Sequence, residues 1–121
     1  MSPVIEEHTE ARLITEATDT FAVPVDLRYD ATSDPRTVHV AFPGGTDWAF
    51  GRDLLEGGMR SPAGRGPIRI WPCGRAQLVV EKHSADGVEV VQFDNASMNR
   101  FLHRIHDESG PEAVRTVTTR T

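Results

Sequence analysis

The chain has 121 residues, 38% of them hydrophobic and 26% charged, which is typical of one soluble globular domain. It has no apolar run near the roughly 20 residues that a membrane-spanning helix needs, so membrane contact would be indirect, through a partner. Its acidic start, MSPVIEEHTEAR, lacks the basic and apolar regions of a signal peptide, and its single cysteine, Cys73, excludes an internal disulfide, so we expect a cytoplasmic protein.

Charge is distributed unevenly along the chain, whose net charge is −5. Residues 1–34 contain eight acidic residues and two arginines, whereas residues 52–75 contain five arginines and two acidic residues. A basic segment of this size can attract an acidic protein partner, but sequence-independent nucleic-acid binding rests on many more phosphate contacts. Four arginines are therefore candidate partner-binding residues, with a merely solvated loop as the open alternative: Arg52, Arg60, Arg65 and Arg69.

The first fifty residues are dominated by strand patterns. Charged and apolar residues alternate from about Val4 to Thr18, which predicts a long first strand. The stretch Phe21–Tyr29 is also extended, but Pro24 cannot donate to a sheet ladder and favours an edge or a connection. The turn residues of 30–35 then lead into a predicted hairpin over Thr37–Phe50.

A short helix and a return loop follow this hairpin. The segment Gly51–Glu56 predicts a helix whose leucines, Leu54 and Leu55, point inward, and Gly57-Gly58 predicts a left-handed stop at its end. The Gly and Pro pairs of Arg60–Pro67 predict a loop that returns the chain to the sheet.

The next elements are three strands and the longest helix. Alternation predicts a strand at Ile68–Trp71 and a second hairpin made by Gln77–Lys82 and Val88–Phe93, with Asp86-Gly87 at its turn. The final helix is expected to lie across the sheet, to be capped by Asp94 or Asn95 and to end at Gly110-Pro111, with 112–121 a frayed tail. Its apolar stripe at i, i+3, i+4 and i+7 is Met98, Phe101, Leu102 and Ile105.

These elements predict a single α+β domain over residues 1–121. Its antiparallel sheet would have about six to seven strands, arranged as two βββα-like halves and packed by the helices.

Motifs that could carry catalysis or bind metal are weak. His103 and His106 are one helical turn apart and could share a metal, but zinc needs about four ligands, and surface histidines beside the apolar stripe are the alternative. The Gly-rich loops lead into strands, whereas a phosphate-binding loop leads into a helix N-terminus. His83, Ser84 and Asp86 are neighbours in one turn, and triad members come from separate elements. The sequence therefore predicts no catalytic, cofactor-binding or metal-binding residue and no enzyme.

Three aromatic residues lie close to the arginine-rich segment. Exposed rings over a basic groove are typical of single-stranded nucleic-acid binding, which Trp48, Phe50 and Trp71 keep open as an alternative function. The alternation of Trp48 with Phe50 favours a buried strand face instead.

Two runs of sequence carry a family resemblance: VPVDLRYDATSDPRTVHVAF (Val23–Phe42) and WAFGRDLLEGGMRSPAGRGPIRIWPC (Trp48–Cys73). They closely resemble the SsgA-like family of sporulation-specific cell division regulators, over about Phe21–Arg104. The second run is similar to the SsgB type, although the chain after Pro111 lacks the acidic run associated with that type.

The resemblance implies a function and an assembly. Family members act without known catalysis at the division septum, where they recruit the tubulin-like protein FtsZ or localise one another. It further implies a fold similar to that of the Whirly and mitochondrial RNA-binding proteins, and a homotrimer.

Overall fold

The structure, a computed structural model, describes the backbone of residues 4–15 and 20–119, and the side chains of these ranges up to residue 107. Over these residues the chain forms eight strands in one antiparallel sheet and two helices. The strands are β1 (Val4–Ile14), β2 (Thr20–Asp30), β3 (Asp34–Ala41), β4 (Asp47–Gly51), β5 (Ala63–Arg65), β6 (Ile68–Cys73), β7 (Gln77–Ser84) and β8 (Gly87–Asp94), and the helices are α1 (Arg52–Gly58) and α2 (Asn95–Thr119).

The sheet consists of two four-stranded meanders, each followed by a helix. The strand order is β4-β3-β2-β1-β8-β7-β6-β5, so the meanders meet where β1 pairs with β8. This junction pairs Arg12–Ile14 with Val90–Gln92 and is three residues long. The α+β class, the single domain and the division into halves are confirmed, but the prediction of six to seven strands is wrong, because β2 and β5 are both strands and each half is ββββα.

Strand β2 is paired with β1 along its whole length, from Asp30 opposite Val4 to Thr20 opposite Ile14. The proline in it, Pro24, lies opposite Glu10. Strand β3 pairs only with Asp26–Asp30, so at Pro24 the side of β2 away from β1 carries no strand of the described residues. The sequence predicts that Phe21–Tyr29 is either an edge strand or a connection. The stretch is a strand with an open edge at Pro24, so the prediction of a connection is wrong.

Strands β1 and β5 also differ from the prediction. β1 begins at Val4 as predicted and ends at Ile14, while residues 16–18 of the predicted strand lie outside the described residues. β5 lies inside the segment predicted to be a loop, where Ala63–Arg65 pairs with Ile68–Ile70 across a turn at Gly66, whose φ is +58°.

The glycines at the end of α1 serve packing and not termination. Gly57 and Gly58 are the last residues of the helix, and the capping residue Met59 that follows is in the right-handed region, so the predicted left-handed stop is wrong. A Cβ on Gly58 would lie 2.4 Å from Ile70 Cγ2, far inside normal contact. The missing side chain therefore lets α1 approach β6 closely.

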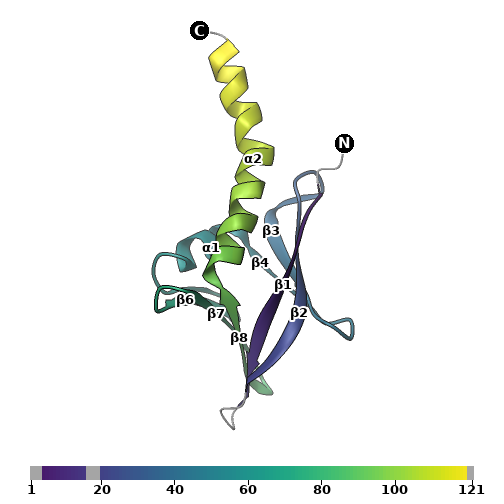
Figure 1. The fold of residues 1–121 in the computed structure, drawn as a ribbon, viewed down its shortest axis with the longest axis vertical. Helices are drawn as coiled ribbons and strands as arrows, with labels where there is room; N and C mark the ends of the chain where they lie inside the picture. The colour runs from purple at the N-terminus through teal and green to yellow at the C-terminus, as the bar shows by residue number, and fades with distance from the viewer. Residues whose placement is uncertain (1–3, 16–19, 120–121) are drawn as a thin grey trace.

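Helix α2 begins as predicted and continues further. Asp94 directly precedes it, and its Oδ2 accepts a hydrogen bond from the Ser97 hydroxyl at 3.3 Å. The first turns pack on β1 and β8, and the helix then runs on beyond the sheet (Figure 1). Its backbone is helical through Gly110-Pro111 to Thr119, so the predicted stop is wrong and 112–119 is helical, because a proline removes one backbone hydrogen bond without forcing an end. Fraying of 112–121 stays a prediction.

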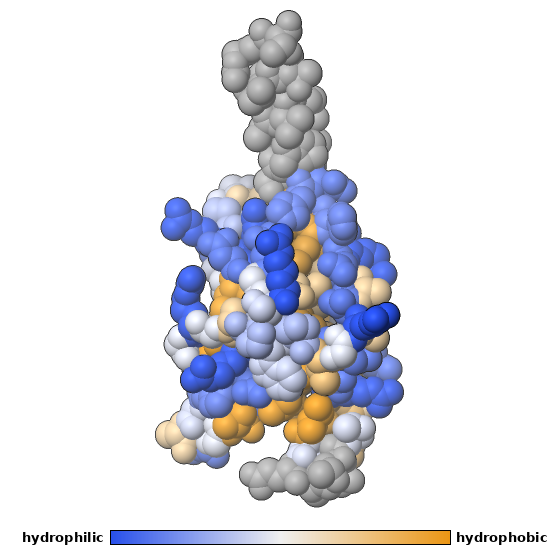
Figure 2. Space-filling view, turned by 90° about the vertical axis from the view of Figure 1, so that its left-hand side faces the viewer, coloured by the Kyte–Doolittle hydropathy of each residue, from blue (hydrophilic) through white to orange (hydrophobic). Residues whose placement is uncertain are grey.

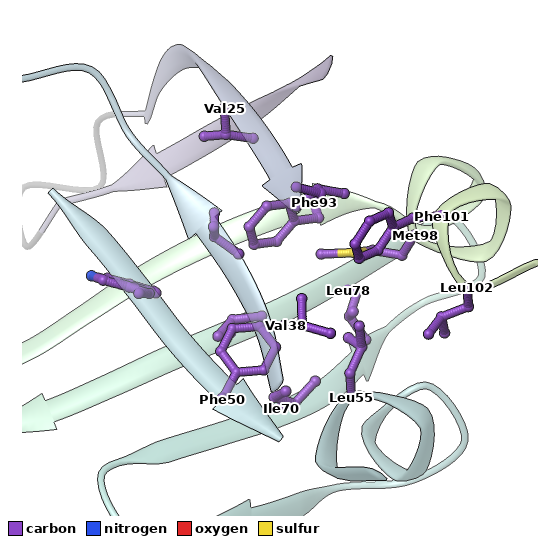
Figure 3. Close-up of a cluster of buried hydrophobic side chains, with 14 of the residues drawn as sticks. Val25, Val38, Phe50, Leu55, Ile70, Leu78, Phe93, Met98, Phe101 and Leu102 are labelled. Carbon is purple, nitrogen blue, oxygen red and sulfur yellow. The ribbon is translucent and has the colours of Figure 1, made fainter. Parts of the chain in front are cut away.

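The core fills the space between the curled sheet and the two helices (Figure 3). All four residues of the α2 stripe are buried, as are Leu54 and Leu55 of α1. Trp48 and Phe50 are 3% and 6% exposed, which confirms them as core residues. Figure 3 shows that the two halves share this core, with Phe50 from one meander and Phe93 from the other directed into the same cluster.

Candidate functional site

The four candidate arginines do not form one patch, and Arg52 has a structural position. It is the first residue of α1, and its Nη1 donates a hydrogen bond of 3.1 Å to the Tyr29 hydroxyl. Its guanidinium also lies 5.8 Å from the centroid of the Tyr29 ring, and its Nε lies 3.8 Å from Glu56 Oε2. Arg52 therefore fastens α1 to β2.

Arg65 and Arg69 lie on opposite faces of the sheet edge. Arg65 is opposite the buried Ile68 and so shares the core face, whereas Arg69 is opposite Gly64 on the outer face. Both side chains are exposed. A partner that lies on one face of the sheet would therefore meet only one of these two arginines.

Arg60 lines a hollow of about 370 Å³ between α1 and α2. We call this hollow the interhelical groove. Its lining comes from the end of α1 and from one flank of α2: Glu56, Gly57, Met59, Arg60, Asn99, Leu102, His103 and His106. The sequence singled out Arg60 by charge but missed Asn99 and Met59, since nothing in the local pattern places α1 beside α2.

Glu56 is the one carboxylate that the described residues contribute to the groove lining, and it already has neighbours on both helices. Glu56 Oε2 lies 2.8 Å from His106 Nε2 and 3.8 Å from Arg52 Nε, so it links the two helices electrostatically. This oxygen is buried and receives no well-aligned hydrogen bond from the described residues. By contrast, the side chains of Arg60, Asn99 and His103 are exposed and make no hydrogen bond or ion pair within the described part of the chain.

The opposite flank of α2 is clamped to β1 by a carboxylate. Arg100 Nε donates to Glu7 Oε2 at 2.8 Å, and Arg104 Nη1 donates to Glu7 Oε1 at 2.7 Å and to the Glu6 carbonyl at 2.6 Å. Hydrogen bonds from Arg100, and then from Arg104, lower the pKa of Glu7. On one flank of α2 the arginines are thus bound to β1, while on the groove flank Asn99 and His103 have no such partner among the described residues.

A second hollow, of about 240 Å³, lies at the end of the core away from the helices. Its apolar lining includes Phe42 and Trp48, whose rings meet edge to face with centroids 4.9 Å apart. Phe21 and Val88 are large apolar residues that are about half exposed. Figure 2 shows apolar atoms gathered at the end of the molecule away from α2.

The two histidines that the sequence offered as possible metal ligands, His103 and His106, have different surroundings. Both line the groove, but His106 lies 2.8 Å from Glu56 Oε2, whereas His103 has no polar partner among the described residues. In the ranges that the structure describes, no three His, Cys, Asp or Glu side chains come together as a metal site would require. The turn containing Ser84 uses its hydroxyl locally, accepting from the Asp86 N–H at 3.3 Å and donating to the Gly87 carbonyl at 3.4 Å.

No helix within the described residues has the length and apolar character that crossing a bilayer requires.

Trp71, the third aromatic residue near the arginines, is half-buried and donates from Nε1 to Glu81 Oε2 at 3.2 Å.

Comparison with protein families gives a match over residues 23–112 to the model described as Streptomyces sporulation and cell division protein, SsgA. Similar curated proteins are named sporulation-specific cell division protein SsgB. The chain is 34% identical over 83% of its length to the one of Kineococcus radiotolerans, 32% over 86% to that of Streptomyces coelicolor, and 36% over 84% to that of Salinispora tropica. The chain spans 65%, 80% and 77% of the length of these three relatives.

Two solved structures have the same fold. One is of SsgB, described for mutations that correlate with longitudinal cell division during sporulation of Streptomyces coelicolor; its TM-score is 0.80 at 32% identity, over 88% of this chain and 87% of that one. The other is an SsgA-like sporulation-specific cell division protein from Thermobifida fusca, with a TM-score of 0.81 at 23% identity, over 98% of this chain and 96% of that one.

Proposed function

Because the chain belongs to the SsgA family of sporulation and cell division proteins, as the resemblance predicted, we propose that it is a non-enzymatic regulator of sporulation-specific cell division. The observation that carries this proposal is the similarity to three SsgB proteins over more than four fifths of the chain. In this role the protein acts by protein–protein interaction in the cytoplasm, at the division septum, and positions or recruits division proteins there.

We further propose FtsZ and other SsgA-like proteins as its partners, a homotrimer as its assembly, and a likeness of its fold to the Whirly and mitochondrial RNA-binding proteins. The apolar end of the molecule, with Phe21 and Val88 exposed, supports an assembly because exposed apolar patches mark interaction surfaces. The exposed arginines Arg60, Arg65 and Arg69 support an acidic partner.

Fluorescent tagging combined with deletion of the gene tests the role in the cell. We expect the tagged protein at sporulation septa and a deletion strain with few or misplaced septa. A strain with normal septation and spores, together with diffuse fluorescence, would contradict the role.

A pull-down with purified FtsZ and with sister family members tests the partners. We expect at least one of them to be retained by the parent chain, and sedimentation should give a mass above that of a monomer. If none is retained while circular dichroism shows a folded chain, the recruiting function is wrong.

Single-stranded nucleic-acid binding loses its main support in this structure. Trp48 and Phe50 are buried in the core and offer no face for a base to stack on. A salt titration against labelled single strands checks this, since any electrostatic affinity is greatest at low ionic strength. Binding at low ionic strength would support single-stranded nucleic-acid binding as the function.

A further inference from the structure

We propose that the interhelical groove binds an acidic segment of a protein partner, in which a carboxylate side chain neighbours an apolar one. The identity of that partner rests on the proposed function, but the chemistry of the site rests on the groove alone.

The groove offers three free side chains that can donate hydrogen bonds, of which the Arg60 guanidinium can only donate. Arg60 from the end of α1, and Asn99 and His103 from α2, have exposed side chains with no polar contact to the described part of the protein. Asn99 and His103 are four residues apart and so lie on the same side of α2, facing Arg60 across the hollow. Donors arranged in this way match a ligand that supplies oxygen acceptors.

The charge in the groove favours an anion. Glu56 is the one acid among the described residues of the lining, and it already has Arg52 as a cationic partner and His106 as a close neighbour. Among the described residues the guanidinium of Arg60 has no carboxylate partner, whereas Arg100 and Arg104 on the other flank of α2 share Glu7. A ligand carboxylate would give Arg60 the negative partner that Glu7 gives to Arg100 and Arg104.

The apolar part of the lining selects a peptide over a free inorganic anion. Met59 is partly exposed and Leu102 is 8% exposed, and both line the hollow. A hollow of about 370 Å³ has room for an apolar side chain next to a carboxylate. Methionine adapts its shape to different apolar partners, which suits a site that accepts a short segment.

Selection from a random dodecapeptide display library, with the purified full-length chain as target, tests the site. We expect enriched peptides that combine Asp or Glu with Leu, Met or Phe. In a ¹⁵N-labelled sample, one synthetic consensus peptide should shift the resonances of Arg60, Asn99 and His103. Enrichment of basic peptides, or shifts confined to other surfaces, would overturn the proposal.

Charge reversal with a matched control makes the test quantitative. Arg60→Glu should weaken the consensus peptide about tenfold, because it places a like charge against the ligand carboxylate. Arg36→Glu makes the same change at an exposed position on β3 outside the groove and should leave the affinity unchanged. Equal affinities of the two variants would show that the peptide binds elsewhere.

Two further probes separate other ligands and the proposed function. Inorganic phosphate and a labelled single-stranded oligonucleotide should not compete with the peptide, and competition by either would overturn the choice of a peptide ligand. In cells, an Arg60→Glu strain with normal septa beside a deletion strain without them would refute the groove's role and keep the proposed function. Normal septa in both strains would refute the proposed function, while the peptide data would still decide the chemistry of the groove.

Discussion

Helices α1 and α2 cover the same core, but they are fitted to it in different ways. α2 projects four large apolar side chains, Met98, Phe101, Leu102 and Ile105, into the space under the sheet. α1 has seven residues and meets β6 through Gly58, where a side chain would collide with Ile70. Both helices bury side chains in the core, Leu54 and Leu55 in the case of α1, and α1 depends in addition on the missing side chain of Gly58 for its close approach to β6.

The largest effect should come from charge in the shared core. Phe101→Asp places a carboxylate at a position with 0% exposure, and we expect it to unfold the domain, at a cost above about 4 kcal/mol. Leu54→Asp is the corresponding change on α1 and should unfold the domain as well. Thermal denaturation followed by circular dichroism measures both, and a parent-like melting temperature for Phe101→Asp would show that the assignment of the buried face is wrong.

The close approach of α1 should give the next effect. Gly58→Ala puts a methyl group 2.4 Å from Ile70 Cγ2, and we expect a loss of about 2–3 kcal/mol in the free energy of unfolding. Gly57→Ala is the control, because its Cβ would meet Ala63 Cβ at an ordinary 3.9 Å. Urea titrations should show Gly57→Ala no less stable than the parent, since alanine favours the helix by up to about 1 kcal/mol. Equal stability of the two variants would contradict a close contact at Gly58.

The clamp on α2 should give a smaller, pH-dependent effect. Glu7→Gln removes the charged partner of Arg100 and Arg104 and should cost about 1–2 kcal/mol at neutral pH. Because the folded-state pKa of Glu7 is lowered, its contribution is complete above the ordinary glutamate value of about 4.3 and is lost as the pH falls through the folded-state pKa. Urea titrations from pH 7 downward should show the two proteins converging in acid. A constant difference would mean that the clamp is not ionic.

The smallest effect on stability should come from the exposed sheet edge. Arg65→Glu should leave the free energy of unfolding within about 0.5 kcal/mol of the parent, because the side chain is exposed at β5. We also expect it to weaken a partner contact, which the pull-down with FtsZ measures. A strongly destabilised Arg65→Glu variant would place this arginine in the fold and not in the interface.

Elements with a repeating side-chain pattern could be predicted from the sequence. The alternation around Val38 and Val40 predicts β3 and its hairpin with β4, and the stripe through Phe101 predicts α2, because burial on one face imposes a period. Strand β5 has no such pattern. Its three residues include Gly64, and it is a strand because β6 offers a ladder, which is a tertiary condition.

Features that depend on tertiary contacts are harder to predict from the sequence. Gly58 reads equally as a helix stop or as a close contact, and only the position of Ile70 decides between them. The charge of Arg60 could be found in the sequence, but its place in a groove could not, because that depends on where α1 lies relative to α2. The aromatic pair Trp48 and Phe50 was correctly predicted to be buried because alternation is a local signal.

The junction between the meanders sets the order in which this chain can complete its sheet. Each hairpin pairs segments that are neighbours in the sequence. Strand β1 pairs with β8 through Arg12–Ile14 and Val90–Gln92, which are separated by most of the domain's sequence. Pairing between such distant segments is slow, because a long loop has to be closed first. On the ribosome, the free side of β1 therefore stays open until the last strand has emerged, so synthesis of residue 94 and beyond is what allows the domain to close.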